Sequence, residues 1–136
     1  AAMALGADGV QMGSRFVCSD ESSGHAAFKQ HVLDSKEGDT LLTLKELAPV
    51  RMMRNAFFEE VRQAYARCAT TEELKALLGR ARSKRGMFEG DLEQGELEIG
   101  QVGATFKEVL PAATIVEHVM NEFRTAQQDL AALRFA

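Results

Sequence analysis

The sequence has little of what would mark several large classes of protein. Its 136 residues include no tryptophan, one tyrosine, two prolines and two cysteines. Cys18 and Cys68 are far apart in the sequence and match neither a disulfide framework nor a metal-binding motif. No apolar run approaches the roughly 18 residues that span a membrane, and no charged-then-apolar leader is present. We therefore expect a cytoplasmic location and no membrane partner.

The chain also lacks a large excess of positive or of negative charge. The chain has 16 Lys and Arg against 20 Asp and Glu, for a net charge of −4. Because nucleic-acid-binding domains usually carry a basic face, no nucleic-acid partner is expected. The length suits one domain, and 46% hydrophobic residues are ordinary for a globular protein.

The stretch from Gly6 to Phe16, GADGVQMGSRF, carries the clearest local pattern. Gly6 closes a helix that is already under way at residue 1, and Val10–Met12 is typical of a short buried strand. Gly13 then offers a backbone N–H without a Cβ, and Ser14 adds a second N–H and a hydroxyl. In parallel α/β folds, ligands bind at the carboxyl ends of strands. This stretch therefore predicts a phosphate-binding loop.

The same stretch resembles the last strand of flavin-dependent (β/α)8 barrels, in particular the nitronate monooxygenase (2-nitropropane dioxygenase) family. That family includes the flavin-dependent enoyl-acyl carrier protein reductase. The shorter core Gly-Ala-Asp-x-Val-x-x-Gly also occurs in other phosphate-binding barrels. In the family, the matching segment holds the FMN phosphate. The resemblance therefore implies that Gln11, Met12, Gly13 and Ser14 bind FMN.

A second match lies downstream. GDLEQGELEIGQ, residues 90–101, is similar to a family loop that returns to the flavin. The resemblance places Gly100 and Gln101 on the substrate side. Glu96 and Ile99 depart from the family pattern, where Ser and Ala are common, so they are expected to alter the substrate pocket. From its chemistry alone, the Gln101 amide either orients a substrate oxygen or caps the next helix.

Three further residues have both a functional and a structural interpretation. His25 begins a family-like His-x-x-Phe-Lys segment and either faces the flavin pocket or bonds locally at a helix start. Arg51 and Arg54 are three residues apart and are expected on one helix face. They either bind a phosphopantetheine or CoA phosphate or neutralise nearby carboxylates. The acidic residues between 89 and 96 match no calcium loop, and no metal site is predicted.

Hydrophobic periodicity predicts that the rest of the chain is mainly helical. A capping box of Thr70 and Glu73 marks one helix start. The basic run at 80–85 is expected to be a solvated face near the end of that helix. The predicted elements are a helix at 25–33 capped by Ser22 or Ser23, a strand at 40–43, helices at 57–68 and 70–81, a short helix at 101–106 and a helix at 112–133.

Together these features predict an α/β fold: the C-terminal part of a flavin-binding (β/α)8 TIM barrel with a largely helical inserted cap. Residues 1–17 would form the end of barrel helix 7 and barrel strand 8, residues 18–106 the cap, and residues 107–136 the final barrel helix. The chain is thus expected to be part of a longer protein. The final helix is expected to pack over the strand at Val10–Met12.

The resemblance implies an FMN-dependent oxidoreductase that oxidises alkyl nitronates. The alternative within the family is reduction of an enoyl-acyl carrier protein with NAD(P)H, and a different class of function is a helical interaction module without cofactor. The family's catalytic histidine would lie upstream, so no catalytic residue is expected here and these residues alone should be inactive. The expected partners are a small-molecule or acyl-thioester substrate and, for the full-length protein, a second copy in a homodimer.

Overall fold

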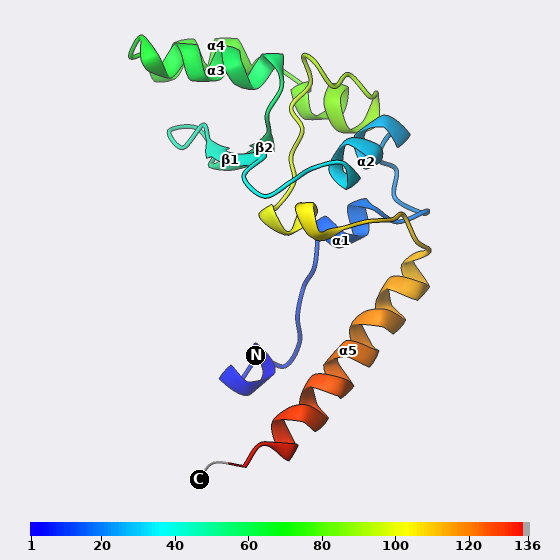
Figure 1. Cartoon of the computed structure of the whole chain (residues 1–136). Helices are drawn as coiled ribbons and strands as arrows, with labels where there is room; N and C mark the ends of the chain where they lie inside the picture. The colour runs from blue at the N-terminus through cyan, green and yellow to red at the C-terminus, as the bar shows by residue number, and fades with distance from the viewer. Residues whose placement is uncertain (135–136) are drawn as a thin grey trace.

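The computed structural model describes residues 1–134, which form helices around one two-stranded antiparallel sheet (Figure 1). Strand β1 (Thr40–Thr43) pairs with β2 (Val50–Met53) so that Leu42 lies opposite Arg51. The helices are η1 (Met3–Leu5), α1 (Ser14–Val17), α2 (Ala26–Leu33), α3 (Ala56–Ala66), α4 (Thr71–Leu78), the π-helix η2 (Lys84–Phe88), the 3-10 helix η3 (Gln101–Thr105) and α5 (Ala112–Ala132).

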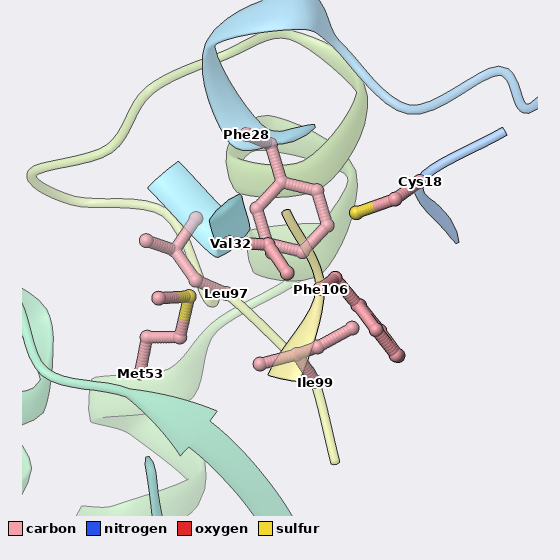
Figure 2. Close-up of a cluster of buried hydrophobic side chains, with 7 residues drawn as sticks. All are labelled: Cys18, Phe28, Val32, Met53, Leu97, Ile99 and Phe106. Atoms are coloured by element: carbon pink, nitrogen blue, oxygen red, sulfur yellow. The ribbon is translucent and has the colours of Figure 1, made fainter. Parts of the chain in front are cut away.

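Two hydrophobic cores meet at β2. Consecutive residues of a strand point to opposite faces, so Met53 enters one core and Met52 the other. The first core, drawn in Figure 2, consists of Cys18, Phe28, Val32, Met53, Leu97, Ile99 and Phe106. The second core consists of Leu44, Met52, Phe57, Phe58, Val61, Ala64 and Leu74.

Local hydrogen bonds explain where the predicted helices begin. The Asn55 side chain accepts from the Phe58 N–H at 2.9 Å and so caps α3. The predicted capping box is confirmed, because Thr70 and Glu73 each accept from the other's backbone N–H. The predictions of β1, η3 and a long C-terminal helix are also confirmed.

The predicted strand at Val10–Met12 is wrong. Residues 9–13 have no regular secondary structure, and the Val10 side chain is 61% exposed. A strand is held in a parallel sheet by hydrogen bonds to its neighbours. No backbone hydrogen bond between residues 1–134 links Val10–Met12 to another segment. Val10–Met12 has the apolar pattern of a strand, but residues 1–134 contain no neighbouring strand that pairs with this segment.

The predicted N-cap of α2 is also wrong, because His25 takes that role in place of Ser22 or Ser23. The His25 Nδ1 accepts a hydrogen bond of 3.1 Å from the Ala27 N–H. The Ser22 Oγ instead accepts from the Gly24 N–H within the preceding turn. The local interpretation of His25 is thereby confirmed.

The arginine predictions need two corrections. Arg51 lies on β2 and Arg54 follows it, so the two residues do not share a helix face; pairing with β1 keeps this segment extended. In the basic run, Arg82 is half-buried rather than solvated. Its guanidinium donates to the carbonyls of Leu77 and Leu78 and lies over the Phe57 ring. It thus satisfies the last carbonyls of α4, a helix that ends at Leu78 and does not reach residue 81.

Helix α5 extends away from the two cores, and the N-terminal segment lies beside it (Figure 1). Val10, Val119, Met120 and Phe123 line a common open cavity of about 290 Å³, so α5 lies near Val10. The predicted packing of this helix over a strand is not seen, because Val10–Met12 forms no strand. Several apolar side chains of α5 remain exposed, including Met120 and Phe123. None of the helices within residues 1–134 has the length and hydropathy needed to span a membrane.

Candidate functional site

The structure brings the two family-like stretches together at Ser14 and Gly100. The Gly100 N–H donates a hydrogen bond of 3.0 Å to the Ser14 Oγ, across 86 residues of sequence. A Cβ at Gly100 would lie 2.7 Å from the same oxygen, so glycine permits this close approach. The predicted phosphate-binding loop and the predicted substrate-side loop are therefore in direct contact.

Strand β2 positions the downstream loop. The Met53 N–H donates to the Leu97 carbonyl at 2.9 Å, and the Ile99 N–H donates to the Arg51 carbonyl at 3.2 Å. Glu98 forms an antiparallel bridge with Met52. Residues 97–99 therefore run along β2 as an added strand-like segment, and their side chains alternate between faces. Leu97 and Ile99 enter the first core (Figure 2), and the chain arrives at Gly100 beside α1.

An open depression of about 390 Å³ lies at this junction. Val17, Met87 and Ile99 form its apolar wall, and Arg51 and Glu98 are its charged residues. Ser14 and Gly100 complete the lining. The composition is typical of a small-molecule site, in which apolar walls surround a few polar groups.

The loop before α1 fits a phosphate monoester. Within residues 1–134, the backbone N–H groups of Gly13, Ser14 and Arg15 donate to no backbone carbonyl. A Cβ built at Gly13 would meet nothing within 4 Å, so a ligand can approach the backbone there. Because the Ser14 Oγ accepts from Gly100, its own proton remains available to an anionic oxygen. Gln11 and Met12 lead into this loop and are exposed.

Arg15 does not serve this loop, although it is the nearest cation in the sequence. Its guanidinium donates to the carbonyls of Cys18 and Glu108 and lies 5.2 Å from the centre of the Phe106 ring. These contacts fasten α1 to the segment that precedes α5. By anchoring α1, they also help to hold the Gly13–Ser14 turn at the start of that helix.

Among the charged residues around the depression, Arg51 has a hydrogen-bond partner, whereas no ion pair among residues 1–134 includes Glu96 or Glu98. The Arg51 guanidinium donates to the Thr40 carbonyl at 2.8 Å and so is held toward β1. Burial raises the pKa of Glu98. Burial, reinforced by the nearby Glu98 carboxylate and opposed by Arg82, raises the pKa of Glu96 to about 7. Glu98 on the strand-like segment and Glu96 just before it therefore ionise less readily than ordinary glutamates.

Two predicted substrate-side residues lie outside this depression. Gln101 is exposed and lines a neighbouring cavity of about 470 Å³ with Thr40 and Thr105. It does not cap η3, because the N-cap is Gly100 and that helix has no side-chain cap. The His25 N–H donates to the carbonyl of Met87, a residue of the depression wall, and its ring lies against Gly90.

Comparison with known proteins agrees with this arrangement. The family model described as nitronate monooxygenase matches residues 1–122, which include both family-like stretches. The chain belongs to the nitronate monooxygenase family. The resemblance stated from the sequence is confirmed.

Individual relatives of this family member support the same assignment. A probable nitronate monooxygenase from Staphylococcus aureus (strain MSSA476) is 30% identical over 129 residues, covering 94% of this chain and 36% of that protein. One from Bacillus subtilis (strain 168) is 44% identical over 64 residues, covering 46% of this chain and 18% of that protein. The chain therefore spans about a third or less of the length of these curated relatives.

Solved structures give the corresponding result for the fold. FabK from Thermotoga maritima superimposes with a TM-score of 0.81 at 32% identity, covering 96% of this chain and 41% of FabK. Its M276A mutant superimposes with a TM-score of 0.78, covering 96% of this chain and 39% of the mutant. The arrangement of helices and hairpin is therefore shared with part of FabK.

Of the two charged residues of the depression, Arg51 is a predicted phosphate-binding candidate that lies on β2 instead of a helix, and Glu98 is not predicted from the sequence. The alternation of Glu96, Leu97, Glu98 and Ile99 is a period-two pattern, which would have predicted an extended segment with both glutamates on one face.

Proposed function

We propose that this chain is the C-terminal part of an FMN-dependent oxidoreductase in which residues 11–14 hold the FMN phosphate. The observation that supports this most directly is the hydrogen bond between Gly100 and Ser14. It supports the proposal because Ser14 of the phosphate-type loop and Gly100 of the second family-like stretch line the same depression. A helical interaction module without cofactor has no need for such a junction.

The residues present would bind and orient the cofactor. The N–H groups of Gly13 and Ser14 and the Ser14 hydroxyl would donate hydrogen bonds to phosphate oxygens. Val17, Met87 and Ile99 would exclude water from the adjacent depression. FMN, when bound, supplies the electron-transfer chemistry. No residue of this chain is assigned a catalytic role.

The barrel placement is part of the same proposal. Residues 1–17 would lead into the barrel wall without the strand at Val10–Met12, residues 18–106 would form the cap, and residues 107–136 would include the final barrel helix, α5. The exposed apolar side chains of Val10, Met120 and Phe123 support this, because other barrel strands and helices would cover them. The TM-score of 0.81 with FabK is consistent with such a position in a longer chain.

Oxidation of alkyl nitronates is the reaction we favour for the full-length protein. The curated relatives are named probable nitronate monooxygenases. Reduction of an enoyl thioester with NAD(P)H is the second candidate, because FabK shares the fold of 96% of this chain. The substrate would be a small molecule or an acyl thioester, and we propose a homodimeric cytoplasmic enzyme.

The test uses the full-length protein. We expect a purified yellow protein whose released cofactor is FMN, together with oxygen consumption on an alkyl nitronate. Oxidation of NADPH driven by a crotonyl thioester, without nitronate turnover, would assign the second reaction. A colourless protein that stays colourless after incubation with FMN would refute the flavin proposal and favour an interaction module.

A further inference from the structure

Asn55 joins the end of β2 to the start of α3, and both polar groups of its side chain are bonded. Its Oδ1 accepts from the Phe58 N–H at 2.9 Å and caps α3. Its Nδ2 donates to the carbonyl of Leu92 at 2.9 Å and to that of Gly95 at 2.8 Å, across 37 and 40 residues of sequence. An amide can do both because it carries a donor and an acceptor. One side chain therefore links the start of a helix to the loop that leads to Gly100.

The bond from Asn55 to Gly95 continues the pairing of β2 with the strand-like segment 97–99. Four hydrogen bonds, each two residues further along one stretch and two residues back along the other, join Arg51 to Ile99, Met53 to Leu97, Asn55 to Gly95 and Phe57 to Glu93. Three of them are backbone bonds, and the Asn55 side chain makes the remaining one, where the extended chain gives way to α3. The stretches 51–57 and 93–99 thus run antiparallel in a single register.

The loop at Gly95 depends on these donors. Gly95 is buried, and a Cβ there would clash with the Gly86 Cα of η2. A buried carbonyl that loses its donor destabilises the conformation in which it is buried. The neighbouring Gln94 carbonyl is bonded separately, to the Arg82 guanidinium at 2.9 Å. Loss of the Asn55 amide therefore removes the side-chain anchor of Gly95 without disturbing the next carbonyl along the loop.

We propose that Asn55 is a positioning residue for the substrate side of the flavin site, because it sets the register in which the loop delivers Gly100 to Ser14. The inference rests on the proposed function, which assigns a substrate to the depression at these two residues. Asn55 itself does not line the depression. Without its amide the loop leaves this register for part of the time, and only the remaining fraction binds substrate. The apparent affinity falls with that fraction, whereas turnover at saturating substrate is kept.

The test separates the two ends of the Asn55 side chain in the full-length, FMN-loaded protein. Asn55→Ser and Asn55→Asp both keep an oxygen that can cap α3, but they lack the amide donors. Kinetics are measured per bound FMN with ethylnitronate, and with crotonyl-coenzyme A plus NADPH. On the substrate that the wild type accepts, we expect KM to rise about tenfold in Asn55→Ser, the effect of two lost hydrogen bonds, with kcat within twofold. Asn55→Asp should have a still higher KM, because its carboxylate faces two carbonyl oxygens.

Hydrogen–deuterium exchange of the same proteins reports the position of the loop independently of turnover. Residues 97–101 should exchange about tenfold faster in Asn55→Ser, while residues 56–66 of α3 exchange as in the wild type. The control is Thr70→Ala, which removes the side-chain cap of α4. It should lower the melting temperature but leave KM and the exchange of residues 97–101 unchanged.

Wild-type KM and wild-type exchange at residues 97–101 in Asn55→Ser would overturn the inference and leave Asn55 as a helix cap. Either change without the other would also overturn it, because the proposed role requires that loop position and substrate affinity change together. A wild type that lacks FMN, or that turns over neither substrate, would instead refute the proposed function.

Discussion

The Gly100 N–H and the Ser14 Oγ are joined by a hydrogen bond of 3.0 Å, although 86 residues separate them in the sequence. Ser14 is the first residue of α1, and Gly100 directly follows the segment 97–99 that pairs along β2. The contact leaves the Ser14 proton free to donate. It also means that changes at Ser14 act on both loops at once.

Replacing Ser14 with Asp should abolish FMN binding without unfolding the protein. The new carboxylate can still accept from the Gly100 N–H, but it repels the FMN phosphate, because like charges in a partly buried site disfavour each other. Flavin content after gel filtration measures the effect. The matched control is Ser23→Asp, since Ser23 is exposed in the following loop. Stoichiometric flavin in Ser14→Asp would show that the phosphate binds elsewhere.

Gly13→Ala should weaken FMN binding at least tenfold while the melting temperature of the apoprotein stays within about 2 °C. The added Cβ meets no protein atom within 4 Å, so the described residues lose nothing, but it occupies the space through which a phosphate reaches the backbone. Gly9→Ala is the control, because its Cβ also meets nothing within 4 Å. If both variants hold FMN like the wild type, the Gly13 backbone does not contact the phosphate.

Gln101→Ala tests the remaining functional interpretation of this residue. Its side chain is exposed and does not cap η3, so we expect no loss of thermal stability. If the amide orients a substrate oxygen, kcat/KM should fall about three- to tenfold, the range of one hydrogen bond. The assay uses nitronate and enoyl substrates with flavin content normalised. An unchanged kcat/KM on the accepted substrate would remove Gln101 from the site.

Glu96→Gln should change how folding stability depends on pH. The folded-state pKa of Glu96 is raised from 4.5 to about 7, so the folded protein binds its proton more tightly than the unfolded chain. The protonated Glu96 contributes to folding stability in full below pH 4.5. This contribution is lost as pH rises toward 7, and above pH 7 the stability no longer depends on this group. The loss should be on the order of 1–3 kcal/mol.

Urea denaturation at pH 5 and at pH 8 measures this difference. The wild type should lose more free energy of unfolding between the two values than Glu96→Gln does. The exposed Glu93→Gln variant should behave like the wild type. Parallel pH profiles for wild type and Glu96→Gln would contradict a raised pKa at this position.

The sequence by itself determined the family and most of the helices. The stretches at 6–16 and 90–101 carried the resemblance, and the capping box at Thr70 and Glu73 located a helix start, because these signals depend on neighbouring residues alone. Periodic apolar residues likewise predicted α3 and α5. Each of these features is local, so the identity and order of the residues suffice to specify it.

Tertiary structure decided the remaining features. Val10–Met12 has a strand-like pattern, yet it forms no strand where no partner lies beside it. The backbone at Arg51 is extended because β2 pairs with β1, although the three-residue spacing of Arg51 and Arg54 suits a helix. Glu98 enters the depression because residues 97–99 align along β2, and Ser14 meets Gly100 for the same reason. Pairing between segments distant in sequence fixes these positions, and such pairing depends on which partners the fold brings together.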